Sequence, residues 1–216
     1  MSINNCINLI INYADLPKAA DPIRQILQTI FVLSDEDVVC QTTITEKPTK
    51  ISVEVLVTSR VNEEGLKTYK VWHNRNLLGT IELDYLDILG NGKLGSAIYP
   101  DGVHQQLIGY GEDSSKPVKK IYIENLESFS RKKYSGVGSL LLRMAYQESA
   151  LKGCKGKIMT YAISNSPGFY YKCGYRHVNP ENNKLIKEAI EKASSQKKQK
   201  IPNTKLYIGE MYFDEV

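Results

Sequence analysis

YIENLESFSRKKYSGVGSLLL, residues 122–142, combines three patterns that together decide the fold. From Lys120 to Leu126 apolar and polar residues alternate, which predicts a β-strand. A basic turn with two glycines follows. From Gly138 to about Lys152 the spacing of apolar residues predicts an amphipathic helix with Leu140, Met144 and Leu151 on one face. We therefore expect a strand, a glycine-containing turn and a helix in direct succession.

The turn between this strand and this helix has the features of an anion-binding loop. Gly136 and Gly138 can adopt positive φ angles and place no side chain between the backbone and a ligand. Successive N–H groups of such a turn, followed by the positive end of a helix, favour a bound diphosphate. Arg131, Lys132 and Lys133 add positive charge beside it. A turn that merely connects strand to helix, without a ligand, is the alternative.

Two other phosphate-binding motifs do not fit the turn. A P-loop needs Gly-Lys-Ser/Thr where the helix begins, whereas this chain has Gly138-Ser139-Leu140. A dinucleotide-binding fingerprint needs a third glycine, and Leu141 occupies that position.

The rest of the chain is predicted to alternate strands and helices around this segment. Predicted strands are Ile7–Ile11 (at an edge), Ile51–Thr58, Tyr69–Trp72, Leu77–Leu83, Lys157–Ile163, Tyr175–Val178 and Lys205–Phe213. Predicted helices are Pro22–Phe31, Phe169–Lys172 and Pro180–Ser194. Residues 88–117 read as a loop or insertion with a short hairpin at Leu107–Tyr110. We expect one α/β domain over residues 1–216, with residues 1–50 the hardest part to interpret.

Composition narrows the class of protein. The chain has 216 residues and a net charge of +4, which by itself does not favour nucleic acid as a partner. Four cysteines without a C-x-x-C pair and three histidines far apart give no pattern for a metal site or a disulfide framework. No stretch has the roughly 18 to 20 apolar residues that cross a bilayer, and the N-terminus lacks signal-peptide features. We therefore expect a cytoplasmic protein without membrane contact.

Two segments resemble motifs of the GNAT N-acetyltransferase superfamily. Its central motif is a strand, then Arg/Gln-x-x-Gly-x-Gly/Ala, then a helix. Ser135-Gly136-Val137-Gly138 matches this motif, and Lys133 stands where the family usually has Arg or Gln. Downstream, FYYKCGY at Phe169–Tyr175 resembles the second motif, Phe-Tyr-x-Lys-x-Gly-Phe. The resemblance covers residues 118–178, and two motifs in the right order with a strand between them are more specific than either alone.

The resemblance implies an α/β (α+β) fold with a twisted mixed sheet flanked by helices, splayed near Glu124–Ser128 to admit a pantetheine arm. It implies transfer of an acetyl group from acetyl-CoA to a primary amine by direct attack in a ternary complex, with no metal. Residues 118–178 would form the acetyl-CoA-binding core. The residues expected to contact acetyl-CoA are Leu126, Ser128, Arg131, Lys132, Lys133, Tyr134, Ser135, Gly136, Val137, Gly138, Ser139 and Asn165.

Two side chains are candidates for proton transfer. An alkyl amine, with a pKa near ~10.4, must lose a proton before it attacks, and Glu124 resembles the base of diamine acetyltransferases; a solvated carboxylate paired with a lysine is its alternative. Resemblance to the second motif makes Tyr170 the acid that protonates the leaving thiolate, with a packed aromatic as its alternative. Asn165 either bonds the pantetheine arm or caps the next helix. Amides near Leu126–Ser128 would stabilise the oxyanion.

The acceptor amine is not fixed by the sequence. A small polyamine-like molecule and a protein amine are the leading options, and the acidic residues Glu82, Asp84 and Asp87 would attract a cation. Two other functions stay open: a non-catalytic acyl-CoA-binding regulatory module on the same fold, and a nucleic-acid contact through the Lys-rich segment Lys184–Lys205. A homodimer is also left open.

Overall fold

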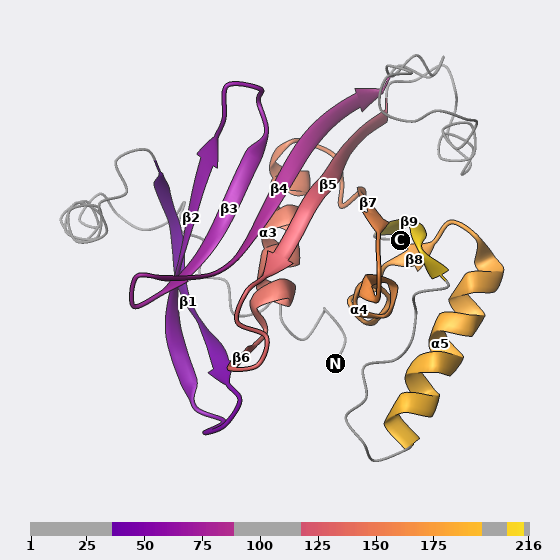
Figure 1. Ribbon diagram of the computed structural model, residues 1–216. Coiled ribbons are helices and arrows are strands. Elements are labelled where there is room, and N and C mark those ends of the chain that lie inside the picture. Colours follow the sequence, from indigo (N-terminus) through magenta and orange to yellow (C-terminus); the bar gives the residue numbers. More distant parts are fainter. Residues whose placement is uncertain (1–35, 89–117, 196–206, 214–216) are drawn as a thin grey trace. The chain divides into compact units, whose positions relative to one another are not determined.

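The computed structural model describes residues 36–88, 118–195 and 207–213 (Figure 1). Within them, three helices accompany a nine-stranded mixed sheet with the order β6-β1-β2-β3-β4-β5-β7-β9-β8. The predicted α/β class with a mixed sheet is confirmed. The predictions for Ile7–Ile11, Pro22–Phe31, Leu107–Tyr110 and most of the 88–117 loop lie outside the described residues, as does the Lys-rich segment beyond residue 195.

The chain divides into two compact units that interleave along the sequence. Unit 1 comprises Met1–Asp84 and Glu124–Ala145, and unit 2 comprises Tyr85–Ile123 and Tyr146–Val216. Strand β5 (Val118–Ser128) and helix α3 (Val137–Leu151) each run from one unit into the other.

Unit 1 contains an antiparallel arrangement of four strands and the start of α3. Its strands are β1 (Asp37–Glu46), β2 (Ser52–Val61), β3 (Lys67–His73) and β4 (Asn76–Ile88, to Asp84 in this unit), together with the two-residue β6 (Tyr134–Ser135). Alternating apolar residues of β2, β3 and β4 form the core, with Val57, Val71 and Ile81 completely buried. A tight turn joins β3 to β4, and its residues Asn74 and Arg75 both have positive φ angles.

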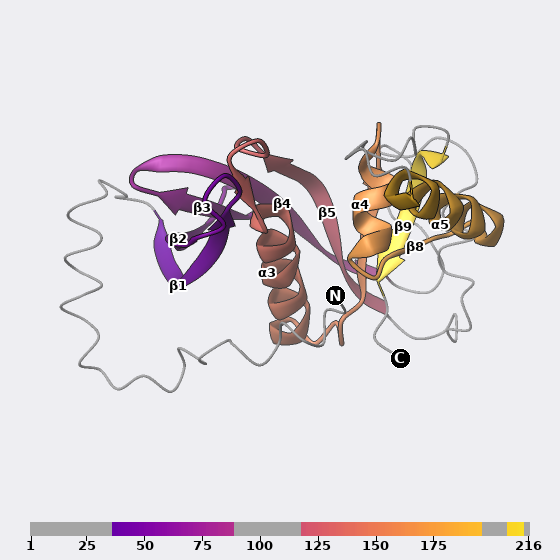
Figure 2. The ribbon, with the colours of Figure 1, turned by 90° about the horizontal axis from the view of Figure 1, so that it is seen from below.

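A glycine in β4 allows the start of α3 and the end of β5 to approach the sheet closely. A Cβ atom on Gly79 would lie 2.6 Å from the Glu127 carbonyl oxygen and 2.8 Å from a Val137 methyl group. Glycine is required where two backbones come this near. The N–H of Phe129 also donates to the Leu78 carbonyl oxygen at 2.9 Å. Helix α3 consequently lies against one face of the strands of unit 1, as Figure 2 shows.

Unit 2 is built on β7 (Ile158–Ala162). It pairs in parallel with β5 from Ile121↔Ile158 to Ile123↔Thr160, and β5 continues to Ser128 beyond the last of these pairs. Strand β9 (Gly209–Phe213) pairs antiparallel with β7 and with β8 (Arg176–His177). Helices α4 (Ser166–Lys172) and α5 (Pro180–Ser195) complete the unit. The elements predicted here exist, with shorter strands than the sequence pattern indicated.

Candidate active site

The glycine turn in unit 1 is held between β1 and α3. Strand β6 pairs with the end of β1 through Thr45↔Ser135 and Glu46↔Tyr134. Gly136 follows with a φ angle of +97°, a conformation that favours glycine, and its carbonyl oxygen accepts the N–H of Leu140 at 2.8 Å. The expected strand–turn–helix succession is therefore present, with Gly136 as the residue from which α3 begins.

The first amides of α3 have the arrangement that an anion requires. Val137, Gly138 and Ser139 precede the Leu140 N–H that makes the first bond to the Gly136 carbonyl, so their own N–H groups have no acceptor within the helix. The first turn of the helix carries no acidic side chain. Gly138 lies inside this turn and does not share the positive φ of Gly136. Of the two glycines, only Gly136 uses that freedom.

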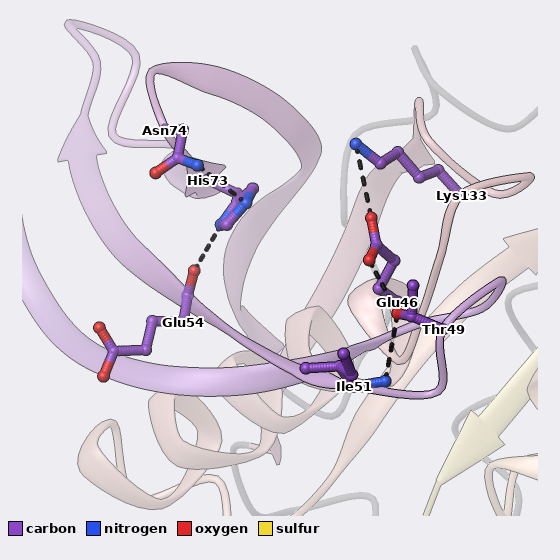
Figure 3. A network of polar contacts seen from close by, with 7 residues as sticks. All are labelled: Glu46, Thr49, Ile51, Glu54, His73, Asn74 and Lys133. Atoms are coloured by element: carbon purple, nitrogen blue, oxygen red, sulfur yellow. Dashed lines mark hydrogen bonds and ion pairs between the residues drawn. The ribbon is translucent and has the colours of Figure 1, made fainter.

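Two of the basic side chains of the turn, those of Arg131 and Lys133, contact nearby protein groups. Lys133 lies 3.5 Å from a Glu46 carboxylate oxygen (Figure 3). Its Nζ also lies over the Tyr134 ring, 5.2 Å from the centroid. Interaction with the Tyr134 hydroxyl, and then with Glu46, raises the pKa of Lys133 and keeps it charged. The Arg131 Nε donates to the Ser128 carbonyl oxygen at 3.2 Å. These contacts hold positive charge beside the helix start.

Lys47 is a residue of this site that the sequence did not indicate. Its N–H donates to the Lys133 carbonyl oxygen at 2.8 Å, and its Nζ donates to the Arg131 carbonyl oxygen. It directly follows β1, so the pairing of β1 with β6 brings it to the turn. No local pattern could have revealed a contact across so many intervening residues.

Tyr134 fixes the turn to the sheet. Its side chain is buried, and its ring meets the ring of His73 edge-on with 5.6 Å between centroids. The His73 Nδ1 is in turn 2.7 Å from the Glu54 carbonyl oxygen (Figure 3). Because the ring is enclosed, Tyr134 positions the backbone of its neighbours Lys133 and Ser135.

Glu124 is exposed on β5 and belongs to a group of carboxylates in unit 1. Partial burial raises its pKa, and the negative charges of Asp84 and then Glu82 on β4 raise it further. A carboxylate with a raised pKa is a stronger base near neutral pH. Leu126 and Ser128, further along β5, are half-buried, and Glu127 is exposed. The side chain of Asp87 is outside the described part of the chain.

Tyr170 lies in unit 2 and is 5% exposed. Its ring packs edge-on against Phe169 and Tyr175, each with 5.3 Å between centroids. Burial raises the pKa of its phenol, while a hydrogen bond with Thr160 opposes the rise. The Thr160 hydroxyl donates to the Ile123 carbonyl oxygen at 3.3 Å. The phenol thus keeps its proton at neutral pH and is held in a defined place.

Asn165 stands at the cap position of α4 without a side-chain capping bond to that helix. The capping role considered for its side chain is therefore not observed. Unit 1 contains Glu124 and all of the predicted acetyl-CoA contacts except Asn165. Asn165 and Tyr170 belong to unit 2.

Two kinds of feature are absent from the described residues, a cluster of metal ligands and a membrane-crossing helix. No three or more His, Cys, Asp and Glu side chains are placed there to hold a metal ion. None of the described helices combines the length and hydrophobicity needed to cross a bilayer.

Comparison with known proteins gives structural likeness only. No protein-family model matches the chain, and no curated protein matches its sequence. Its structure is similar to a protein assigned as arylalkylamine N-acetyltransferase 7 from the yellow fever mosquito Aedes aegypti, at 11% identity and a TM-score of 0.49 over 82% of this chain and 94% of that one. It is also similar to Arabidopsis thaliana NAA60 in complex with acetyl-CoA, at 16% identity and a TM-score of 0.38 over 53% of this chain and 64% of that one. Because both TM-scores are below 0.5, we base a function on the residues of the chain itself.

Proposed function

We propose that the chain transfers an acetyl group from acetyl-CoA to a primary amine by direct attack in a ternary complex. The observation that carries the proposal is the start of α3, where a positive-φ glycine leads into a helix with three amides ahead of its first intrahelical bond. The resemblance of residues 118–178 to two acetyltransferase motifs indicates which anion would bind there, the diphosphate of acetyl-CoA. The acceptor is a small polyamine-like molecule or a protein amine.

The turn fits the diphosphate of acetyl-CoA. The amides of Val137, Gly138 and Ser139 would donate to it, and Arg131, Lys132, Lys133 and Lys47 would supply positive charge. At Gly136 the absence of a side chain keeps the approach open, since the nearest atom to a Cβ built there, in Ile44, is 3.9 Å away. Leu126, Ser128 and Asn165 are assigned to the pantetheine arm.

Glu124 is proposed to remove the proton of the amine. Acetyl-CoA, as co-substrate, supplies a thioester carbonyl that the amine attacks and a thiolate that leaves. The incoming amine is a cation at neutral pH, and Glu82 and Asp84 favour its approach while raising the pKa of Glu124. The same two carboxylates thus serve both attraction and basicity.

Tyr170 is proposed to give a proton to the thiolate as it leaves. A thiol has a pKa near ~8.5, so a phenol whose pKa is raised by burial still holds its proton when the thiolate forms. Amides of Leu126–Ser128 are proposed to stabilise the oxyanion.

A non-catalytic acyl-CoA-binding module is the second candidate. The enclosure of Tyr170 by Phe169 and Tyr175 favours it, because a packed ring can serve structure alone. The two functions differ in one measurement, the release of CoA thiol from acetyl-CoA in the presence of a panel of amines, with acetylated products identified by mass spectrometry. Thiol release that requires an amine supports the enzyme. Tight acetyl-CoA binding without any amine-dependent release would leave the binding module.

A further inference from the structure

One end of the ladder formed by β7 and β9 in unit 2 brings a carboxylate near exposed apolar side chains. Tyr161 and Glu210 are paired directly across the antiparallel ladder, so their side chains lie on the same face. Ile163 directly follows β7 and Ile208 directly precedes β9, so both lie next to the last pair of the ladder, Ala162↔Gly209. We call Tyr161, Ile163, Ile208 and Glu210 the β7–β9 patch.

The apolar members of the patch are open to solvent. Tyr161 is 47% exposed, Ile163 61% and Ile208 44%, whereas large apolar residues are normally withdrawn from water. On the opposite face of the same strands, Met211 and Thr160 are buried. The exposed apolar side chains are thus confined to the end of the ladder, and exposed apolar side chains that gather in one place mark binding surfaces.

Glu210 lacks the partner that a buried carboxyl group needs. Its side chain is 3% exposed, and its Oε2 has no hydrogen-bond partner among the described residues. This burial raises the pKa of Glu210 to about 7. A buried carboxylate without a donor is unfavourable. A positively charged donor entering past Tyr161 or Ile208 would satisfy both the charge and the vacant acceptor.

We propose that the β7–β9 patch binds an organic ammonium ion, with its charged head on Glu210 and its hydrocarbon body on Tyr161, Ile163 and Ile208. The Tyr161 ring adds a second attraction, because an aromatic face attracts ammonium groups. A neutral hydrocarbon would leave Glu210 unpartnered, and an anion would be repelled by it. This site is separate from the proposed function, in which the reacting amine loses its proton to Glu124; here Glu210 holds an ammonium ion that keeps its charge.

The test is calorimetric titration of the full chain, without acetyl-CoA, at pH 8. The probes are hexylamine, which is a cation at this pH, and hexanol, its neutral counterpart. We expect hexylamine to bind about tenfold or more tightly than hexanol, the gain of one charge-assisted hydrogen bond. Glu210→Gln should remove that preference and leave hexanol binding within about twofold of the wild type.

Two further variants separate the patch from general effects on folding. Ile163→Ser, at an exposed position, should weaken both probes severalfold. Leu185→Ser, an exposed apolar position on α5, is the matched control and should change neither. Thermal unfolding of each variant shows whether it is folded. If Glu210→Gln does not fold, an undiminished hexylamine affinity in Ile163→Ser overturns the proposal.

The outcomes distinguish this inference from the proposed function. If the hexylamine affinity of Glu210→Gln stays within twofold of that of the wild type, the proposed ammonium site is overturned, even if amine-dependent thiol release occurs. Binding that depends on Glu210 while no acetyl transfer is found keeps the ammonium site and rejects the acetyltransferase.

Discussion

At the scale of single residues, removal of the Tyr170 hydroxyl tests whether this side chain acts in catalysis or only in packing. Tyr170→Phe keeps the buried ring between Phe169 and Tyr175 and removes the group hydrogen-bonded to Thr160. If the phenol protonates the thiolate, kcat should fall at least tenfold while acetyl-CoA affinity stays within about twofold. Tyr171→Phe, one position along the same helix, is the control. A kcat within twofold of the wild type would assign Tyr170 to packing alone.

Glu210 gives a second residue-scale prediction, on stability against pH. Burial raises its pKa from 4.5 to about 7, so between these values the folded chain retains a proton that the unfolded chain has released. The free energy of unfolding should therefore fall as pH rises through this window, by roughly 3 kcal/mol. Titratable groups that strand pairing places on the same face are Tyr161, Tyr212 and Arg176, and the Arg176 guanidinium is bonded to the carbonyl oxygens of Tyr171 and Tyr175.

The measurement for Glu210 is urea unfolding at pH values from 4.5 to 8 for the wild type and Glu210→Gln. Because glutamine does not titrate, the difference in unfolding free energy between the two proteins should change in favour of the variant as pH rises. A difference that stays constant across the window would show that the carboxyl group is solvated in the folded chain.

At the scale of elements, the glycine turn can be tested against another turn with the same backbone strain. Gly136 has a φ of +97° and Gly65, between β2 and β3, has +84°. An alanine at either position should cost roughly 1 kcal/mol of stability or somewhat more. Only Gly136→Ala should lower acetyl-CoA affinity, by about tenfold or more, because its methyl group projects at the proposed diphosphate. Equal affinities for the two variants by calorimetry would remove the turn from the cofactor site.

The same elements show how far sequence alone reaches. The segment from β5 through α3 was predictable because its strand alternation, glycine turn and helical spacing are all local signals. Strand β1 was missed: DVVCQTTITE carries several threonines and few large apolar residues, and much of it is half-buried or exposed. With β1 unseen, the contacts of Lys47 and Glu46 with the turn could not be foreseen. Likewise, a single glycine within a strand pattern did not indicate that the Glu127 carbonyl group approaches Gly79 closely.

At the scale of the whole molecule, the proposed cofactor contacts come from two separate segments of the chain. Val137, Gly138 and Ser139, assigned to the diphosphate, lie at the start of α3, while Asn165 and Tyr170 lie at the cap position of α4 and within α4. Acetyl-CoA should reduce the local opening of both segments, because a ligand that binds only the closed state of a segment stabilises that state. A fragment that carries the diphosphate but no pantetheine arm should act on the start of α3 alone.

Hydrogen exchange read by mass spectrometry tests this division with acetyl-CoA and ADP, each near 100 times its Kd, where binding contributes about 2.7 kcal/mol. Both ligands should slow exchange in the peptide spanning Ser135–Leu142. Only acetyl-CoA should slow it in the peptide spanning Asn165–Gly174, and the α5 peptide Lys184–Ser195 should not respond to either. Absence of protection at Ser135–Leu142 would contradict the diphosphate assignment. Protection there without any at Asn165–Gly174 would withdraw Asn165 and Tyr170 from the site and leave the turn in place.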